Sequence, residues 1–350
     1  MSHYKHNNRC VASRVHCRYG EILLGSRGST LYFSDDHGGS WLPLLKLPVS
    51  AMTRLQAMTH ISRRFFRQDV YHLIPFDQNI LIAFAFRAVY VCDFHSGAIL
   101  SEPAPIRGSR PAAVCLAPDG VLYYGEYRDN PGRTPVHIFG SVDQGRSWNT
   151  VYCIENVRHV HGVYYDSYED VFWVTTGDTN AESAIWVSDD RFRSLRKVLF
   201  GSQQTRAIRL VFTPEHIYFG SDAPDARNFL YRLHRSSYHL EQLVEVGGSV
   251  FHGCKTASGI FFSTACEPSS VNDERQTVVW YSADGESWRP IRSFKKDLLP
   301  MKLFQYGQVF FTEGMEHAPG VWLTPYSTSG SLRSIYLDES DLMTRGFLHE

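Results

Sequence analysis

The middle of this chain carries histidines and acidic residues whose side chains can transfer protons. His159 and His161 are separated by one residue, so on a β-strand they point to the same side. A neutral imidazole can carry a proton near pH 7 or ligate a metal. Glu126, Asp178 and Asp222 supply carboxyl groups of the kind that act in pairs as acid and base. These five residues are the candidate catalytic set.

A second set of side chains fits the binding of an acidic sugar ring. A guanidinium makes forked hydrogen bonds to a carboxylate, and a phenol offers a flat surface with one hydroxyl group. The candidate binding residues are Arg110, Arg128, Arg158, Arg206, His252, Glu267 and Tyr127. Nothing in the sequence requires a cofactor, and no residue is assigned as a metal ligand. A divalent metal at the histidine pair stays open as an alternative.

A short motif recurs along the chain and indicates its architecture. It reads Ser-x-Asp-x-Gly-x-x-Trp at 34–41 and 141–148, and it is one residue shorter at 282–288. At 188–195, Phe192 and Leu195 replace the glycine and the tryptophan. The copies that begin at 141 and 188 are 47 residues apart, and the next begins 94 residues later, which is twice that interval. A fixed period of this length is typical of a repeat architecture.

Apolar, strand-like runs precede each copy of the motif, and turns rich in Gly, Asn, Asp and Pro separate the runs. Three further runs fall where the period predicts a unit, which brings the count to seven. We therefore predict an all-β fold, a single seven-bladed β-propeller domain over 1–350 with four-stranded antiparallel blades, with six blades as the lesser alternative. The predicted blades are 10–49, 69–106, 110–153, 158–200, 205–246, 248–297 and 299–338, with an insertion at 50–68 that carries a short helix or a loop.

This topology brings the candidate residues together. In a four-stranded meander, the first strand begins at the edge of the sheet where the second strand ends. Arg110, Arg158 and Arg206 fall at predicted beginnings of first strands, and Asp178 and Asp222 fall at predicted ends of second strands. A cleft lined in this way at the mouth of a closed ring is a natural ligand site.

The motif resembles the Asp-box, or BNR repeat, of sialidase-like β-propellers, and the resemblance runs through most of the chain. It implies that the motif is a turn whose aspartate accepts backbone N–H bonds, on the face opposite the active site. The aspartates with this structural role are Asp36, Asp143, Asp190 and Asp284. The chain departs from sialidases because their Arg-Ile-Pro motif is absent; Arg110-Pro111 lacks the intervening residue. The residue types at the other edge are also similar to those of propeller-fold polysaccharide lyases.

Two reactions fit these residues. A glycoside hydrolase needs two carboxyl groups about 5 to 10 Å apart. A lyase needs a base, such as His161 or His159, for the proton next to a uronate carboxylate. We expect an enzyme that cleaves an acidic oligosaccharide or polysaccharide of the uronate or sialate type. The alternative is a non-catalytic propeller that binds a glycan or a protein at the same edge, for example in polysaccharide assembly.

The bulk composition excludes several other classes. The 35 basic and 36 acidic residues nearly cancel, which argues against nucleic acid as a partner. No apolar run approaches the roughly 20 residues that span a bilayer, and the polar N-terminus lacks the apolar core of a signal peptide. The seven cysteines include no Cys-x-x-Cys pair, which favours free thiols in a reducing compartment. We therefore expect a cytoplasmic protein without a membrane span.

Overall fold

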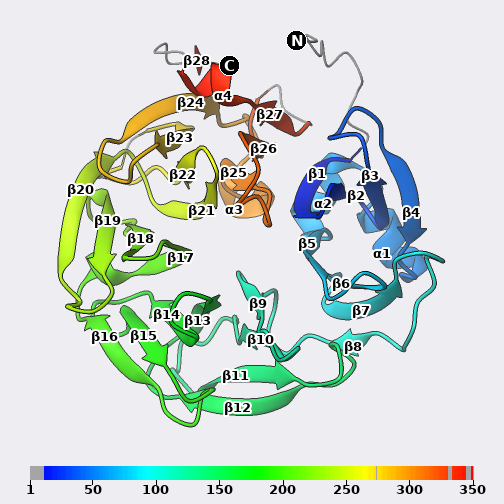
Figure 1. The fold of residues 1–350 in the computed structure, drawn as a ribbon, viewed down its shortest axis with the longest axis horizontal. Helices are drawn as coiled ribbons and strands as arrows, with labels where there is room; N and C mark the ends of the chain where they lie inside the picture. The colour runs from blue at the N-terminus through cyan, green and yellow to red at the C-terminus, as the bar shows by residue number, and fades with distance from the viewer. Residues whose placement is uncertain (1–11, 273, 330–332, 344–347, 350) are drawn as a thin grey trace.

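Seven β-sheets stand side by side around a central axis in the computed structural model (Figure 1). The structure describes residues 12–272, 274–329, 333–343 and 348–349. The first two residues of the predicted first blade, 10 and 11, therefore lie outside the described residues, as do the ends of the predicted domain. The prediction of an all-β, seven-bladed propeller is confirmed.

Each sheet is formed by consecutive strands of the chain. The first three sheets hold β1 (Arg14–Tyr19), β2 (Ile22–Arg27), β3 (Thr30–Ser34) and β4 (Leu42–Lys46); β5 (Val70–Pro75), β6 (Ile80–Ala85), β7 (Ala88–Asp93) and β8 (Ala104–Pro105); and β9 (Val114–Leu116), β10 (Leu122–Gly125), β11 (Val136–Ser141) and β12 (Asn149–Ile154). The fourth and fifth hold β13 (His159–Asp166), β14 (Val171–Gly177), β15 (Ala184–Ser188) and β16 (Arg196–Phe200); and β17 (Ala207–Phe212), β18 (His216–Ser221), β19 (Asn228–His234) and β20 (Leu240–Val246). The last two hold β21 (Val250–Thr256), β22 (Gly259–Thr264), β23 (Gln276–Ser282), β24 (Arg289–Lys295) and β28 (Leu348–His349); and β25 (Gln308–Phe311), β26 (Val321–Tyr326) and β27 (Ile335–Leu337).

Two blades depart from the predicted four strands. The sixth gains β28, which pairs in parallel with β24. The seventh has three strands among the described residues, because the helix α3 (Met301–Phe304) stands where a first strand is predicted. As a consequence β25, predicted as a second strand, becomes the strand of this blade that lines the axis. The ring closes where the backbone N–H of Arg18 donates to the carbonyl of Glu313 at 2.8 Å.

The blades are held together by side chains buried between neighbouring sheets. The central strands are buried over most of their length; every residue of β22 is buried, for example. Apolar residues of adjacent blades form shared clusters, such as Phe84 of β6 with Tyr124 of β10. In the innermost strand of the fourth blade, His161 is the extra residue of a β-bulge between Val160 and Gly162. This packing lies between neighbouring sheets. The sides of the innermost strands that face the central axis are therefore left to line a channel.

The insertion at 50–68 forms two short helices, α1 (Ala51–Gln56) and α2 (His60–Phe66). A capping box between Thr59 and Ser62 begins α2. The helix contacts α3: Arg64 donates from Nε to the carbonyl oxygen of Phe304 at 3.0 Å and pairs with Asp297. The remaining helices are η1 (Gln203–Thr205) and α4 (Glu339–Met343). Among the described residues, none of the helices has the length and apolar character needed to cross a membrane.

The recurring motif forms the same turn four times, between the third and fourth strands of its blade. We call these the Ser-Asp turns (34–41, 141–148, 188–195 and 282–288). In the first, the Ser34 hydroxyl donates to Asp36 and accepts the N–H of Gly38, both at 2.8 Å. The N–H of Ser40 donates to Asp36 at 2.8 Å. The turns that join first and second strands lie at the same edge, since Arg191 of one Ser-Asp turn pairs with Asp119 of the neighbouring blade.

Candidate functional site

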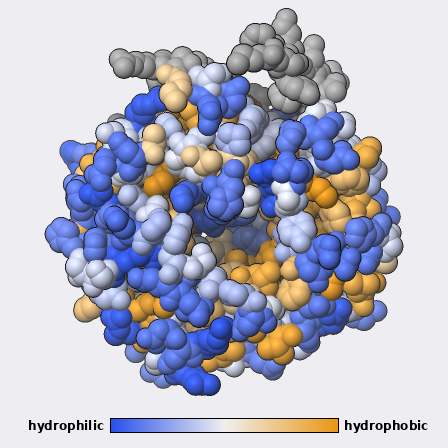
Figure 2. All heavy atoms as spheres, in the orientation of Figure 1, coloured by the Kyte–Doolittle hydropathy of each residue, from blue (hydrophilic) through white to orange (hydrophobic). Residues whose placement is uncertain are grey.

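The ring encloses a channel whose lining is strongly basic. A cavity of about 1110 Å³ runs along the axis and is lined by innermost strands of all seven blades, and Figure 2 shows the ring hollowed at its centre. Its lining includes nine lysines and arginines against four acidic residues, whereas the whole chain has a net charge of −1. An excess of cations in a concave, partly enclosed site attracts anions. We call the end of the channel opposite the Ser-Asp turns the mouth.

Arg110 and Arg14 lie in the channel and have no carboxylate within ion-pair distance among the residues that the structure describes, and the same holds for Arg67 and Arg87 in its lining. Arg110 donates to the side-chain oxygen of Gln305 at 3.0 Å. Arg14 lies over the ring of Phe310, 3.8 Å from its centre, and burial lowers its pKa to about 10. Asp69, whose charge reaches both arginines, is itself bound by Arg63 at 3.2 Å. These two cations are available to an anionic ligand.

Asp178 is the centre of an ion-pair network at the mouth. Its Oδ1 lies 3.1 Å from Arg206 Nη2, and its Oδ2 lies 3.1 Å from Arg158 Nη1. Arg206 also reaches Asp222 through Nε at 3.0 Å, and Arg158 reaches Asp129 at 2.7 Å. Burial would raise the pKa of Asp178, but the neighbouring imidazoles and Arg206 outweigh it and hold this pKa below its usual range. The carboxyl group is therefore an anion fixed between two cations.

The histidine pair, His159 and His161, lies next to the Asp178 carboxylate of this network. His159 Nε2 and His161 Nε2 are 3.1 Å apart, and they lie 3.5 and 3.9 Å from Asp178 Oδ1. Both imidazoles are nearly inaccessible to solvent, with 6% and 2% of their surface exposed. Burial, and then the proximity of His161, lower the pKa of His159 to about 3. The ring of Tyr127 covers His159, with the two ring centres 4.1 Å apart.

Two carboxyl groups, those of Asp222 and Glu267, line the channel beside this cluster. Asp222 is almost fully buried and bound to Arg206, as described above. Burial, and then the charge of Asp222, raise the pKa of Glu267, which also hydrogen-bonds Tyr306. Burial and Glu267 together raise the pKa of Tyr306 to about 12. A carboxyl group paired with a cation, beside another that favours the protonated form, is the arrangement of a base with an acid.

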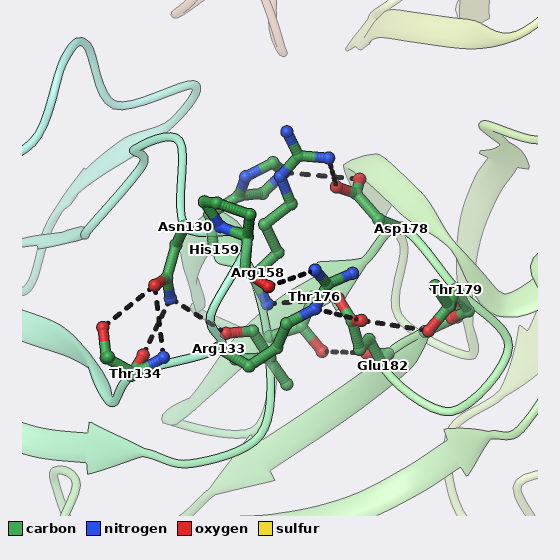
Figure 3. Close-up of polar contacts among 12 residues, drawn as sticks. Asn130, Arg133, Thr134, Arg158, His159, Thr176, Asp178, Thr179 and Glu182 are labelled. Atoms are coloured by element: carbon green, nitrogen blue, oxygen red, sulfur yellow. Dashed lines mark hydrogen bonds and ion pairs between the residues drawn. The ribbon is translucent and has the colours of Figure 1, made fainter.

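The loops that carry the network are braced against each other. Arg133 donates to Glu182 Oε1 at 2.9 Å, and Glu182 Oε2 accepts the backbone N–H of Arg158 at 3.1 Å. Figure 3 shows these contacts beside the Arg158–Asp178 pair, with Asn130 bridging back to Thr134 in its own loop. The third and fourth blades are thus joined at the mouth by charged hydrogen bonds. Such bracing fixes the geometry of the site.

The structure brings most of the predicted site residues together. Arg110, Tyr127, His161, Arg206, Asp222, His252 and Glu267 line the channel. His159 and Asp178 do not line it but contact residues that do, and Arg158 is joined to the channel through Asp178. His252 lies deeper, with its Nε2 2.9 Å from Gln308, and burial lowers its pKa to about 3.

Glu126 and Arg128 are the predicted residues that lie apart from this group. Glu126 accepts hydrogen bonds from Arg128 Nε at 2.8 Å and from His137 at 2.7 Å. Arg128 also donates to Thr134 and to the carbonyl of Pro135 in the same loop. Neither side chain lines the cavity. Their contacts indicate that they shape the loop between β10 and β11.

Several channel residues are not among the predicted ones. Arg14 stands at the beginning of a first strand, the same position as Arg158 and Arg206, so the blade register could have identified it. Because α3 replaces a predicted first strand, Tyr306 lies at the mouth beside Glu267. Arg209, which pairs with Glu313 at 2.6 Å inside the channel, had no signal of its own.

Comparison with known proteins gives the fold but no family. No family model matches the sequence, and no curated protein matches it. The extracellular domain of the putative hybrid two component system BT4673 from B. thetaiotaomicron has a TM-score of 0.59 at 11% identity, over 94% of this chain and 38% of that one. Dihydro-heme d1 dehydrogenase NirN, solved in complex with DHE, has a TM-score of 0.55 at 14% identity, over 93% of this chain and 63% of that one. At these identities the likeness shows the propeller fold alone.

Proposed function

We propose that the channel mouth binds and cleaves an acidic oligosaccharide. The observation that carries the proposal is the position of Arg110, a cation with no carboxylate partner among the described residues, in the same channel as the carboxyl pair Asp222 and Glu267. The excess of cations favours an anionic ligand, while the tyrosines supply flat faces for a sugar ring.

Arg110 is the residue best suited to bind a sugar carboxylate. It lies near Tyr71 and Tyr127, and its charge acts on the hydroxyl groups of both. A forked guanidinium–carboxylate contact at this point would orient one ring at the mouth. Arg206 is less suited to bind a sugar carboxylate, because its guanidinium group already pairs with Asp178 and Asp222.

Hydrolysis is the reaction that the carboxyl pair supports. Glu267 in its protonated form would donate its proton to the glycosidic oxygen as the C–O bond breaks. Asp222, paired with Arg206, would accept a proton from the water that adds to the sugar carbon. This changes the earlier assignment of roles: Glu267 becomes the acid rather than a binding residue. Glu126, tied to Arg128 and His137, takes no part.

The Ser-Asp turns support membership in the Asp-box propellers, which remains part of the proposal. Each aspartate accepts backbone N–H bonds, and Trp148 packs against Phe84 of the preceding blade, as the resemblance implies. The turns lie at the edge opposite the mouth.

The test uses the intact chain with a panel of oligosaccharides that contain uronic or sialic acids, and with neutral oligosaccharides of the same length. Hydrolysis releases reducing ends without ultraviolet absorbance, whereas a lyase produces an absorbing unsaturated sugar. We expect new reducing ends from an acidic substrate alone. Binding without either product would favour the non-catalytic alternative, and absorbance would assign the reaction to a base such as His161.

Single variants test the roles proposed for Glu267 and Arg110. Glu267→Gln should lower kcat about 10²- to 10⁴-fold, the usual contribution of a general acid. Arg110→Met should chiefly raise KM for the acidic substrate. The matched control is Glu245→Gln, since Glu245 is an exposed carboxylate paired with Arg227 away from the channel. An equal loss of activity in Glu245→Gln and Glu267→Gln would contradict the assignment.

A further inference from the structure

Three side-chain atoms that can serve as metal ligands converge beside Tyr127. They are His159 Nε2, His161 Nε2 and an oxygen of Asp178, and all lie within 4.8 Å of one another. The two nitrogens are 3.1 Å apart. The carboxylate oxygen Oδ1 lies 3.5 Å from the first nitrogen and 3.9 Å from the second.

Backbone carbonyl groups determine the protonation of both imidazoles. His159 Nδ1 lies 3.3 Å from the carbonyl oxygen of Arg128, and His161 Nδ1 lies 3.1 Å from that of Ala207. A carbonyl oxygen accepts hydrogen bonds and donates none, so each Nδ1 must carry the proton. In a neutral imidazole the other nitrogen, Nε2, then carries a lone pair. The two lone pairs face each other across 3.1 Å and repel unless a cation lies between them.

We propose that His159, His161 and Asp178 bind a divalent transition-metal ion, with Zn²⁺ as the best-suited ion. Two ligands bound at about 2.1 Å to one zinc ion are roughly 3.0 to 3.4 Å apart, and the two imidazole nitrogens already have this separation. The carboxylate needs to approach by only about half an ångström. Nδ1–H groups held by carbonyls are also the usual outer contacts of metal-bound histidines. Two imidazoles with one carboxylate are a common zinc ligand set.

The charges around the cluster tolerate an added cation. Two arginines, Arg158 and Arg206, are near, but between them they pair with three carboxylates: Asp129, Asp178 and Asp222. The group therefore carries one net negative charge. Asp178 can turn Oδ1 toward the ion while Oδ2 retains its ion pair with Arg158. Arg206 then retains its ion pair with Asp222.

The place of this cluster also suggests an open coordination position. His161 and Arg206 line the channel, whereas His159 lies behind Tyr127. Three protein ligands with the fourth position toward a cavity are typical of a zinc ion that contacts water or a ligand, rather than a purely structural one. The site does not depend on the proposed glycan cleavage, because it rests on the ligand geometry alone.

The test measures Zn²⁺ binding directly. The full chain is stripped with a chelator and titrated with Zn²⁺ by calorimetry, next to the variants His159→Asn and His161→Asn. Asparagine retains an N–H donor near the position of Nδ1, and so the bond to the carbonyl, but removes the Nε2 ligand. We expect one Zn²⁺ per chain in the native protein. Each variant should bind more than about 100-fold more weakly, which exceeds the usual effect of losing an outer contact.

A matched control pair lies at the other edge of the ring. His216 and His234 are neighbours, with ring centres 5.3 Å apart, but no third ligand accompanies them among the described residues. The double variant His216→Asn/His234→Asn should bind Zn²⁺ as the native protein does. Thermal unfolding with and without Zn²⁺ gives a second readout, because the midpoint should rise for the native protein and the control alone.

Two outcomes would overturn the proposal. The first is native protein that binds Zn²⁺ no more tightly than His159→Asn or His161→Asn. The second is a control double variant that loses binding to the same extent as these variants. In either case the two imidazoles would share a proton, and Asp178 would serve to balance its charge.

Discussion

The Ser-Asp turns and the mouth of this ring use aspartate in opposite ways. In the Ser-Asp turns, the carboxylate of the turn aspartate is bound by groups of its own turn, in the same pattern in four blades. At the mouth, Asp178 of the fourth blade is bound by Arg206 of the fifth, and Arg158 of the fourth reaches Asp129 of the third. Contacts that repeat meet a need of every blade. Contacts that occur once and cross between blades meet a need of one place in the ring.

The largest effect is expected from breaking the contacts that cross between blades. Arg206→Met removes the guanidinium between Asp178 and Asp222 and leaves Asp222, 2% exposed, without its ion-pair partner. Removing one member of a buried pair costs about 3 kcal/mol or more, since the remaining charge is uncompensated. We expect a loss of that size in the free energy of unfolding, measured with urea.

Arg227→Met is the control for this prediction within the same blade. Arg227 pairs with Glu245, but both side chains are more than half exposed. An exposed pair contributes between zero and about 1 kcal/mol. Equal losses in Arg206→Met and Arg227→Met would mean that the mouth is no more tightly coupled than the surface, and the contrast between the edges would fail.

A second prediction concerns the one Ser-Asp turn that lacks its glycine. Phe192 adopts a left-handed backbone with φ of 66°, yet it makes the same N–H bond to the turn serine at 2.8 Å. Phe192→Gly should relieve about 1 kcal/mol of backbone strain. It also removes a ring that is 2% exposed and packed on Tyr123 and Phe172, which costs about 3 to 5 kcal/mol.

The net change should therefore be a loss of about 2 to 4 kcal/mol, although the variant restores the consensus residue of the turn. Thermal or urea unfolding measures it. A gain in stability would show that backbone conformation, rather than packing between blades, governs this position.

The contrast between the edges also explains which parts of the structure could be predicted from the sequence. The period and the motif predicted seven blades, and the meander topology of each blade placed Arg158, Asp178 and Arg206 at one edge, where they meet. These are regularities of the chain itself. The bulge at His161 was not predicted, although the first strands of four other blades carry a register shift at a similar point.

The seventh blade and the inner channel could not be predicted either. The pattern of the other blades predicts a first strand around residue 302, but the short helix α3 packs against α2 instead. This exchange moves Tyr306 to the mouth and makes β25 the inner strand. Glu126 fell at the expected edge, but its partners Arg128 and His137 turn it away from the channel. The position of a residue in its strand predicts the edge of the blade at which it lies. The hydrogen-bond partners of the side chain determine where it points.

A third prediction uses the repetition itself. The serines at the first position of the turns, Ser34, Ser141, Ser188 and Ser282, are buried. Each accepts a backbone N–H at 2.8 Å. Replacing any one by alanine leaves that N–H unsatisfied and should cost about 1 to 2 kcal/mol. Because the turns are far apart and alike, the four losses should agree within about 0.5 kcal/mol and should add in pairs.

Urea unfolding of the four single variants and of one double variant checks this expectation. Unequal losses among the four turns would show that their surroundings, and not the turn itself, govern their stability.

The smallest expected effect distinguishes the full turn from the shortened one. The pKa of Asp36 is lowered to about 2, first by the backbone N–H of Ser40 and then by its hydroxyl group. In the shortened turn, the described contacts of Ser287 with Asp284 involve its backbone N–H alone. Ser40→Ala should therefore raise the pKa of Asp36 part of the way to its usual value of 3.8, because the N–H bond stays. Ser287→Ala should leave the pKa of Asp284 unchanged.

The sign of the effect on stability follows from the direction of this shift. The folded pKa of Asp36 lies below the unfolded one, so its contribution is fully present above about pH 4 and is lost as the pH falls toward 2. Ser40→Ala reduces this contribution, so it should lower the free energy of unfolding above about pH 4, and its difference from the native protein should disappear as the pH falls toward 2. NMR titration of the two carboxyl groups measures both pKa values. If Ser287→Ala moved Asp284 as far as Ser40→Ala moves Asp36, the hydroxyl bond would not explain the difference between the turns. The four turns would then share a backbone scaffold whose electrostatics depend on the blade rather than on the motif.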